Sequence, residues 1–393
     1  MAGDCRLMIN LATYEVKLYL NGTLLGDIRH MAQNLTYTRR RTKVGADSID
    51  FTVNDVMLNE WCVQRNYTIG DILKPIALEC RLTRNGVDIV GGFLATMPAY
   101  SPLQLSANLD FHFDGYLNLL AGVYIRNTST NLPLGVITGN AGTLVGNMIT
   151  LANTISSTAG KSYGFTQGSV DNLPSITHTF DNYKTVKDWI CDRCDNTTGA
   201  GPFDVYFHSD KTYDVKADAN FGDVITDWVA YYPTILNGPS ATSISAPEVS
   251  DFATRIIGVG SGEISASSSE NTAILTIQSD ATATSTYGYY EKLIQESSIG
   301  DQTSLDNKAL AELKYTTNIQ WQPEVTFNGK LIVPTPTGNN KIWIGDTITI
   351  NNSEDLTGMT NGKFRVNELN VSITAGGSED IKPVLERVVE NEE

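Results

Sequence analysis

Alternating strands joined by Asn-Gly turns restrict most strongly what this chain can fold into. Residues Tyr14–Leu20 alternate between apolar and polar side chains, Asn21 and Gly22 follow, and residues 23–28 return as a second apolar run. Asn-Gly between two such runs is the strongest short-range signal for a β-hairpin. The same dipeptide recurs at 85–86, between two further strand-like segments. The sequence therefore predicts a protein built largely from β-hairpins.

The composition points in the same direction. The chain has 33 Gly in 393 residues, and only 18% of its residues are charged, below the usual quarter. A chain rich in Thr, Ser, Asn, Gly and Tyr is typical of β-structure with many turns. At about 100–200 residues per domain, the length predicts two to four domains.

Helical periodicity interrupts the strands in the middle of the chain. Apolar residues recur at helical spacing over residues 140–155 and 183–194. A short helix is also predicted over residues 56–64, with Asn54 or Asp55 as its N-cap. These helices make the predicted fold class α+β, dominated by β-structure.

The clearest helical pattern covers residues 303–317. Leu305 and Leu313 fall on one face of this helix. Thr303 and Asp306 resemble a capping box, with Asp in place of the usual Glu or Gln. Residues on both sides of the helix return to strand-like patterns.

Changes of pattern divide the chain into five predicted parts. These are a first β-module over residues 1–114, an α+β insert over 115–240, a strand and helix segment with Ser/Thr-rich loops over 241–320, a second β-module over 321–385 joined by part of 205–280, and an acidic, frayed tail over 386–393.

One short pattern occurs near both ends of the chain. An Ile-Gly-Asp step is followed, 14 or 15 residues after its Asp, by Asn-Gly and then by an alternating strand. The positions are Gly70, Asp71, Asn85 and Gly86 in the first copy, and Gly345, Asp346, Asn361 and Gly362 in the second. Gly permits a tight or left-handed backbone, and Asp can bond the following amides where a strand restarts. The echo predicts two related β-modules around the α+β middle; the alternative is coincidence, because both dipeptides are common in β-proteins.

The formal net charge of −16 limits the possible partners. It argues against a protein that grips nucleic acid, because phosphate contacts need a surface of Lys and Arg. It is compatible with a channel through which DNA slides, since a negative wall repels phosphates.

Cysteine usage and hydropathy bear on where the protein is made. Five scattered cysteines predict reduced thiols and no secreted disulfide framework. The N-terminus has no basic-then-apolar leader, and no stretch approaches the roughly 18 apolar residues of a membrane span. We therefore expect synthesis in the cytoplasm and no membrane span.

Few residues suggest chemistry. His112 lies in an alternating strand, where a surface histidine is expected in preference to a zinc ligand. Cys191 and Cys194 form a CxxC pair inside a predicted helix, without a second pair to complete a zinc site. The glycines of 258–262 lack the following helix of a dinucleotide fingerprint and predict a hairpin or loop. The sequence predicts no catalytic, cofactor-binding or metal-binding residue.

The densest basic run is Arg39, Arg40 and Arg41, followed by Lys43. Two interpretations are open. The run is either a solvated turn or an edge strand protected by charge, or it is a contact with an acidic neighbour in an assembly.

The order of elements from residue 255 onwards resembles a known family. It consists of a strand at 255–260, a Tyr-rich segment at 287–291, a helix with Leu305, Ala309 and Leu313, then Pro323, a strand, Ile344-Gly345-Asp346 and a closing strand. This order is similar to that of phage tail hub proteins, which include the N-terminal region of siphophage tail-associated lysins and the baseplate hubs of contractile-tailed phages. The resemblance covers most of the chain and rests on order and spacing.

This resemblance implies two tail-tube-like β-barrel modules per chain, with smaller α+β domains attached. It also implies a homotrimer in the virion, at the tail tip or baseplate, whose six modules match a six-fold tail tube. Its partners would be the distal tail ring, tail tube, tip or fibre proteins and tape measure. DNA would pass through its lumen without sequence-specific binding. The chain stops at Glu393, before the lytic domains of lysin relatives, so a structural role without enzymatic activity or cofactor is expected.

Three alternatives are open, two of which belong to other classes of protein. A carbohydrate-binding, adhesin-like module would use Trp228, Tyr231 and Tyr232 as an exposed patch, unless these residues pack a core. A hub of a phage-derived contractile injection system would have the same architecture. A cell-wall hydrolase would need a pair of carboxylates, which the sequence does not locate.

Overall fold

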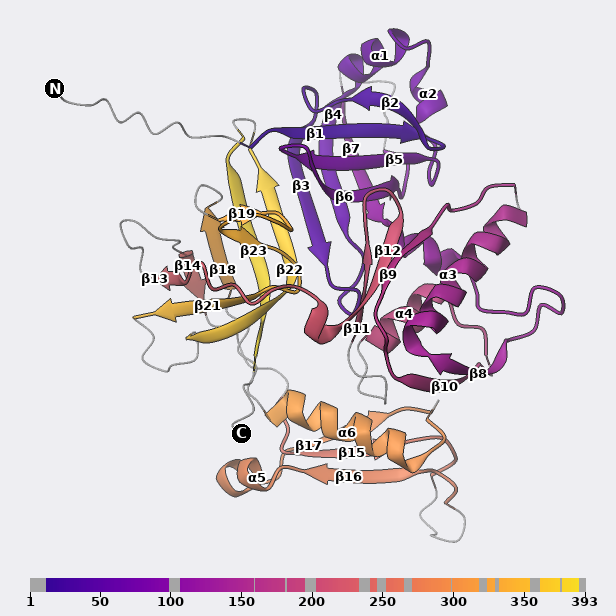
Figure 1. Cartoon of the computed structure of the whole chain (residues 1–393), viewed down its shortest axis with the longest axis vertical. Coiled ribbons are helices and arrows are strands. Elements are labelled where there is room, and N and C mark those ends of the chain that lie inside the picture. Colours follow the sequence, from indigo (N-terminus) through magenta and orange to yellow (C-terminus); the bar gives the residue numbers. More distant parts are fainter. Residues whose placement is uncertain are drawn as a thin grey trace.

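The chain is seen in a computed structural model, with four parts arranged as in Figure 1. The structure describes residues 12–98, 107–158, 160–180, 182–194, 203–232, 241–245, 252–264, 271–297, 299–317, 324–328, 332–353, 361–374 and 377–388. The fold is α+β and dominated by strands, as predicted.

The N-terminal part consists of hairpins and two short helices. Its elements are β1 (Tyr14–Leu20), β2 (Thr23–Asp27), β3 (Gln33–Arg40), β4 (Ser48–Asn54), α1 (Asp55–Val63), α2 (Ile69–Ile72), β5 (Leu78–Arg84), β6 (Val87–Leu94) and β7 (Asn108–Gly115). Both predicted Asn-Gly hairpins are confirmed, since Asn21 and Asn85 have φ of 49° and their glycines also have positive φ. Asn54 is the N-cap of α1, and its side chain accepts hydrogen bonds from the amides of Val56 and Met57.

The insert follows as a compact α+β unit with its own core. Its elements are η1 (Tyr116–Gly122), β8 (Gly135–Asn140), α3 (Ala141–Thr158), β9 (Thr166–Val170), β10 (Ser175–Phe180), α4 (Val186–Cys194), β11 (Phe203–Phe207), β12 (Thr212–Ala217) and η2 (Asp218–Asn220). Helices α3 and α4 confirm the periodicity seen in the sequence. They bury Val145, Ile149 and Trp189, which have no exposed surface, in a cluster separate from that of the large sheet.

A small three-stranded sheet carries the most regular helix on one face (Figure 1). Its elements are β15 (Arg255–Val259), β16 (Leu275–Ser279), α5 (Ala281–Tyr287), β17 (Glu291–Gln295) and α6 (Gln302–Thr317). The helix is confirmed, but its predicted capping box is wrong. The first turn is capped by Asp301, whose side chain accepts from the amide of Ser304 at 2.8 Å. Asp306 instead accepts from the side chain of Gln302 at 2.9 Å.

The remaining strands come from the C-terminal part. They are β13 (Ala230–Tyr232), β14 (Ala241–Ser245), β18 (Glu324–Asn328), β19 (Val333–Pro334), β20 (Lys341–Ile342), β21 (Thr347–Asn352), β22 (Gly362–Ile373) and β23 (Glu379–Arg387). The predicted frayed tail begins too early, because Glu386 and Arg387 belong to β23 and pair with β22. The residues of that tail from 389 onwards lie outside the described residues.

The N-terminal and C-terminal strands form one sheet. Its described path runs β14-β18-β23-β22-β3-β4-β7-β6-β5-β1-β2, with β21 and β13 attached beside β22. The two parts join where β22 pairs antiparallel with β3, from Glu368 opposite Arg40 to Ile373 opposite Leu35. In Figure 1 the yellow strands accordingly lie beside the indigo ones. Among the described strands this sheet is open, with β2 and β14 at its ends.

Each half of this sheet follows the same order. In the N-terminal half, neighbouring strands are β5-β6-β7-β4-β3, and in the C-terminal half they are β21-β22-β23-β18-β14. Every neighbouring pair in both series is antiparallel. The halves differ at the next strand, because β1 is antiparallel to β5 whereas β13 is parallel to β21. The strands after the two Ile-Gly-Asp steps, β5 and β21, thus occupy matching places.

The two Gly-Asp steps nevertheless have different backbones. Gly70 and Asp71 lie in the helical turn α2, where Thr68 and Asp71 form a capping box. Gly345 has φ of +86° and Asp346 precedes β21. Of the tight or left-handed backbone expected at the two glycines, Gly70 lies in a tight helical turn and Gly345 has the left-handed form. The predicted bond from Asp to following amides is wrong at both steps, since each carboxylate accepts from the amide three residues before it.

The second Asn-Gly pair is also not a two-residue turn. Asn361 exchanges hydrogen bonds with the backbone of Asn352, at 2.6 Å from its amide and 3.1 Å to its carbonyl. Gly362 is the first residue of β22. The pair therefore closes a longer connection between β21 and β22.

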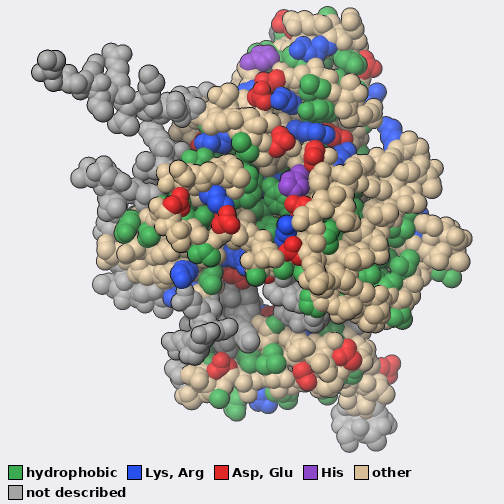
Figure 2. Space-filling model, in the orientation of Figure 1, with side chains coloured by type: hydrophobic (Ala, Val, Ile, Leu, Met, Phe, Trp, Pro, Cys, Tyr) green, Lys and Arg blue, Asp and Glu red, His purple; other side chains and the backbone are tan. Residues whose placement is uncertain are grey.

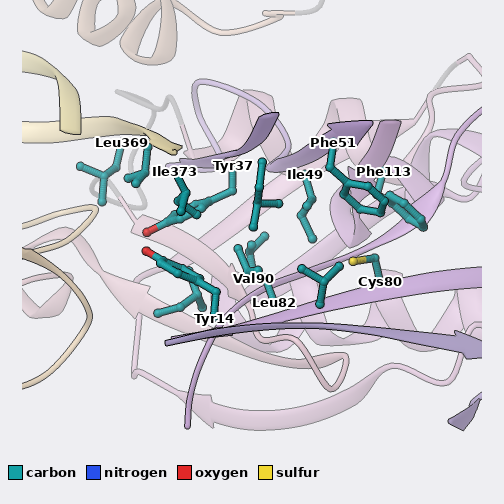
Figure 3. Close-up of a cluster of buried hydrophobic side chains, with 14 of the residues drawn as sticks. Tyr14, Tyr37, Ile49, Phe51, Cys80, Leu82, Val90, Phe113, Leu369 and Ile373 are labelled. Carbon is teal, nitrogen blue, oxygen red and sulfur yellow. The ribbon is translucent and has the colours of Figure 1, made fainter. Parts of the chain in front are cut away.

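The large sheet packs one face into a common apolar core. Strands of both halves contribute to one hydrophobic cluster. In Figure 3, Tyr37, Ile49 and Phe113 from the N-terminal half lie with Leu369 and Ile373 from β22. Because alternate residues of a strand point to opposite faces, this burial fixes which residues the sheet presents on its other face.

Candidate functional surface

The face of the large sheet opposite this core is polar across five adjacent strands of both halves. The strand register places its side chains in rows. One row is Asp380, Ser372, Thr36, Asp50 and His112, and the next is Lys382, Asn370, Thr38, Ser48 and Asp114. We call these two rows, with Arg40, Glu368 and Asp110, the polar face. It crosses the junction between β22 and β3 without interruption.

Cross-strand bonds order the polar face. At the junction, the Thr38 hydroxyl donates to Asn370 at 2.7 Å, and Arg40 pairs with Glu368 at 2.7 Å. Further along, the Thr52 hydroxyl donates to Asp110 at 2.9 Å. Each bond joins side chains that the sheet register already places opposite one another, so the surface is held in one arrangement.

His112 is held between two carboxylates on this face. One ring nitrogen lies 2.5 Å from Asp50 and the other 3.3 Å from Asp114. Burial lowers the pKa of His112, but its contacts with Asp50 and Asp114 outweigh burial and raise that pKa above its ordinary value. The expected strand histidine is therefore found at a position on the sheet surface, engaged by its neighbours.

The balance of charge on the polar face is acidic. Its carboxylates are Asp50, Asp110, Asp114, Glu368 and Asp380, and its cations are Arg40 and Lys382, apart from His112. On the side of the molecule seen in Figure 2, acidic and basic side chains are interspersed. A surface of this kind repels phosphates and offers DNA few cationic contacts.

The basic run lies beside this surface but is used inside the chain. Arg39 is 1% exposed, its guanidinium lies 2.5 Å from Asp47, and it stacks over the ring of Tyr206 at 4.5 Å. Arg41 is 2% exposed and pairs with Asp204. Arg39 and Arg41 thus have their acidic partners in the same chain, which leaves little of either side chain for the assembly contact hypothesised for them. Neither side chain is in a solvated turn.

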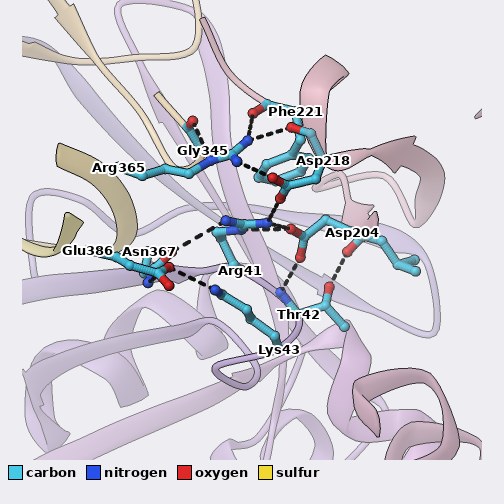
Figure 4. Close-up of polar contacts among 11 residues, drawn as sticks. Arg41, Thr42, Lys43, Asp204, Asp218, Phe221, Gly345, Arg365, Asn367 and Glu386 are labelled. Carbon is cyan, nitrogen blue, oxygen red and sulfur yellow. Dashed lines mark hydrogen bonds and ion pairs between the residues drawn. The ribbon is translucent and has the colours of Figure 1, made fainter. Parts of the chain in front are cut away.

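Arg41 is the centre of a network that joins three parts of the molecule (Figure 4). Its Nε donates to Asp204 of the insert at 2.6 Å, and a second nitrogen pairs with Asp218. Arg365 of β22 also pairs with Asp218 and donates to the carbonyl of Phe221 at 2.7 Å. On the other side, Lys43 pairs with Glu386 at 2.8 Å. The insert is thus held against both halves of the sheet.

The pKa values in this network reflect burial and charge in different proportions. Burial raises the pKa of Asp204 above its ordinary value, although Arg41 opposes this. Burial also acts to raise the pKa of Asp218, but Arg41 and Arg365 together bring it below its ordinary value. Asp218 is therefore the carboxylate that the two arginines hold most firmly in its charged form.

Asp346, which belongs to the second Gly-Asp step, also makes buried contacts that join separate parts of the chain. It has no exposed surface, and its carboxylate accepts from the amides of Trp343 and Asp223, each at 2.9 Å. Lys341 pairs with it at 3.3 Å. Since Asp223 follows the insert, Asp346 holds the end of the insert against the start of β21.

The other residues considered for chemistry in the sequence are packed or hydrogen-bonded within the fold. Burial raises the pKa of the Cys191 thiol to about 11 and that of Cys194 well above its ordinary value, so both are protonated at neutral pH. Of residues 258–262, the first two end β15 and the rest lead out of it, with the amide of Gly260 donating to the carbonyl of Ile274 beside β16. In the part of the chain that the structure describes, no three His, Cys, Asp or Glu side chains are grouped to hold a metal ion. No helix among these residues is long and apolar enough to cross a membrane.

The aromatic patch suggested for sugar binding is not exposed. Trp228 is 4% exposed, its indole nitrogen donates to the carbonyl of Lys341 at 3.1 Å, and its ring meets Phe327 edge to face. Tyr231 and Tyr232 are half-buried in β13. The alternative that these residues pack a core is correct for Trp228.

Comparison with solved structures identifies the fold. The tail protein from Neisseria meningitidis MC58 aligns with a TM-score of 0.62 at 12% identity, over 95% of this chain and 96% of that one. The 43 kDa tail protein of prophage MuSo2 from Shewanella oneidensis gives 0.58 at 11%, over 94% and 98%. Prophage tail protein gp18 from Listeria monocytogenes EGD-e gives 0.53 at 11%, over 96% and 95%. The chain has the fold of phage tail proteins.

The likeness is one of structure, not of sequence. No protein-family model and no curated protein matches this sequence. The expected resemblance to phage tail proteins is confirmed at the level of the fold. A hub assembly, a trimer and two closed barrels stay predictions.

Proposed function

We propose that this chain is a structural protein of a bacteriophage tail, and specifically the hub of its tip or baseplate. The observation that carries the proposal is the shared fold with three phage tail proteins over about 95% of the chain. The two matching five-strand series support the more specific assignment to a hub.

The repeated series suggests how the protein assembles. Each chain contributes two similar halves, each with the same order of antiparallel strands, side by side in one sheet. Three chains would then contribute six similar units, which suits contact with a six-fold tail tube. In this proposal each half belongs to a tube-like module, and closure of the barrels comes from assembly.

The polar face is the surface that we assign to the lumen. It is continuous across both halves and carries an excess of carboxylates. In a ring with this face inwards, DNA would pass at ejection without being held, because phosphate contacts are scarce and the wall is negative. The neighbours of the ring would be the tail tube, distal tail ring, tape measure, and tip or fibre proteins.

We further propose that the protein is not an enzyme and acts as a component of the virion. Burial raises the pKa values of its CxxC thiols, and both ring nitrogens of His112 are occupied by aspartates, so neither a thiolate nor a free ring nitrogen is offered to a substrate. A hub of a contractile injection system is the remaining alternative, since it would use the same ring.

The oligomeric state tests this proposal. Mass photometry of the purified full chain should give a species of three times the chain mass, and electron microscopy should show a ring with three-fold symmetry and six similar densities. A chain that stays monomeric even when mixed with its tail-tube and distal-ring neighbours would contradict the hub assignment. Particles purified with this ring but without DNA would favour an injection system.

A further inference from the structure

The small sheet of β15, β16 and β17 is covered on only one side. Helix α6 packs Leu305, Ala309 and Leu313 onto the face that carries Ile256. The other face is apolar as well, although a sheet face in water is normally polar. Its rows place Ile257 opposite Ile277 on one neighbour and opposite Leu293 on the other.

This uncovered face leaves large side chains in solvent. Ile277 and Leu293 are each 55% exposed, and Leu275, in the next row, is 46% exposed. We call Ile257, Leu275, Ile277 and Leu293 the open sheet face. Exposed apolar groups gathered in this way mark contact surfaces.

A second exposed apolar patch lies on the insert. The rings of Tyr124 and Tyr183 meet edge to face at 6.3 Å, and the Tyr183 hydroxyl donates to the carbonyl of Asn131 at 2.8 Å. Leu132 follows directly and is 61% exposed, and Val136, at the start of β8, is 65% exposed. We call Tyr124, Leu132, Val136 and Tyr183 the tyrosine patch. Tyrosines held this way are typical anchors of protein interfaces.

The borders of the two surfaces differ in charge. Arg126 follows Tyr124 by two residues, next to buried Ile125, and is partly exposed. Its buried Nε has no hydrogen-bond partner among the described residues. Glu263 is exposed, and its carbonyl accepts from the amides of Thr272 and Ala273, just before Leu275 of the open sheet face. A cationic residue therefore follows Tyr124 of one patch closely in the chain, and a carboxylate residue is bonded through its backbone just before Leu275 of the other.

We propose that the tyrosine patch of one copy of this chain docks on the open sheet face of the next copy. The partner is a second copy because a ring of identical chains needs two different complementary surfaces on each chain. This chain carries two such surfaces, on separate parts. In a protein of net charge −16, copies repel each other, so contact is favoured where the surface is apolar and the bordering charges are opposite. The inference rests on the proposed trimer and names its interface.

Two double variants and their mixture test the docking. Leu132→Glu with Val136→Glu disrupts the tyrosine patch, and Ile277→Glu with Leu293→Glu disrupts the open sheet face. Each alone should raise the concentration at which trimers form by about tenfold or more. An equimolar mixture of the two should form a dimer and no trimer, because each mixed pair has one intact tyrosine patch and one intact open sheet face. Mass photometry and light scattering give the masses.

A matched control carries the same two added charges elsewhere. Val56 and Val63 are 46% and 62% exposed on α1, and the Val56→Glu, Val63→Glu variant should stay trimeric. Unchanged melting temperatures would show that the variants fold. If both patch variants remain trimers, or if their mixture gives only monomers, the docking is wrong while the hub proposal stands. A wild-type chain that is monomeric at every concentration overturns both.

Discussion

Arg41 shows how a single residue in this chain depends on partners far away in the sequence. Its side chain is buried between Asp204 and Asp218, which are more than 160 residues further along. An arginine–carboxylate ion pair exposed to solvent contributes little to stability. Removing one partner of a buried pair leaves an uncompensated buried charge, which costs much more free energy. The arginine is therefore needed for the attachment of the insert.

Replacing Arg41 by Met should destabilise the protein by about 3–5 kcal/mol, because Asp204 is left buried and unpaired. Urea denaturation followed by tryptophan fluorescence measures this. The double variant Arg41→Met with Asp204→Leu should recover part of the loss, since no uncompensated charge remains. Equal destabilisation by the single and double variants would show that the pairing is not the cause.

His178 gives the stability of the insert a dependence on pH. Burial between Phe180 and Trp189, together with Arg193 and Lys184, lowers the pKa of His178 to about 4. Its ordinary value is about 6.5. Because the folded pKa is the lower one, folding favours the neutral ring, and stability is lost as the pH falls from about 6.5 towards 4.

The variant His178→Gln should therefore lose less stability than the wild type over this interval. Melting temperatures measured at pH 7 and at pH 4.5 should differ less in the variant. As a control, exposed His30, in another part of the chain, can be changed to Gln. In this variant the melting temperature should change between pH 7 and pH 4.5 by as much as in the wild type. If the melting temperature of His178→Gln changes with pH by as much as that of the wild type, His178 is not the cause of the pH dependence.

At the scale of elements, α6 depends on one face. Leu305 has no exposed surface and packs on the small sheet, whereas Leu310 is 41% exposed on the same helix. Leu305→Ala should destabilise this part by about 2–5 kcal/mol, as expected when a buried leucine leaves a cavity. Leu310→Ala should change stability by less than about 0.5 kcal/mol. Hydrogen exchange of the α6 amides reports on this part separately.

Elements specified by neighbouring residues could be predicted from the sequence. The hairpin of β1 and β2 was found because Asn21 and Gly22 permit the positive φ that its turn needs. The short helix α2 was missed, because Thr68 and Asp71 look like part of a Gly-Asp turn until their reciprocal hydrogen bonds are seen. The repeated Ile-Gly-Asp and Asn-Gly pattern correctly predicted that the strands after it occupy matching places in the sheet. It did not predict the backbone conformation that leads into those strands.

Only the negative charge of the candidate surface could be predicted from the sequence. An acidic wall followed from the net charge, but its position depends on the pairing of β22 with β3, more than 300 residues apart. No local pattern announces such a pairing. For the same reason Arg39 and Arg41 were interpreted as surface charges, since Tyr206, Asp204 and Asp218 lie far along the chain.

At the scale of the whole molecule, the polar face should keep DNA from binding. Asp110 and Asp380 are exposed on this face, on β7 and β23. Changing both to Lys should leave the fold intact but give the purified protein a salt-sensitive affinity for DNA, because cations then face the phosphates. Fluorescence anisotropy with a labelled duplex at low and high salt measures this.

Changing the same two residues to Asn is the matched control. It removes two negative charges without adding positive ones, so it should produce much weaker binding than the Lys variant. Tight DNA binding by the wild-type chain, at any salt concentration near physiological values, would rule out the assignment of this face to a non-adhesive lumen.

The seam between β22 and β3 has a consequence for biosynthesis. Strand β3 ends at residue 40, but the strand that covers its free edge begins at residue 362. While the ribosome makes the residues in between, the N-terminal half exposes an unpaired strand edge, which is a template for association with other chains. Closing so long a loop is also slow. The nascent chain therefore stays vulnerable to aggregation until almost its last strand has emerged, and a helper that shields this edge would raise the yield of correctly folded protein.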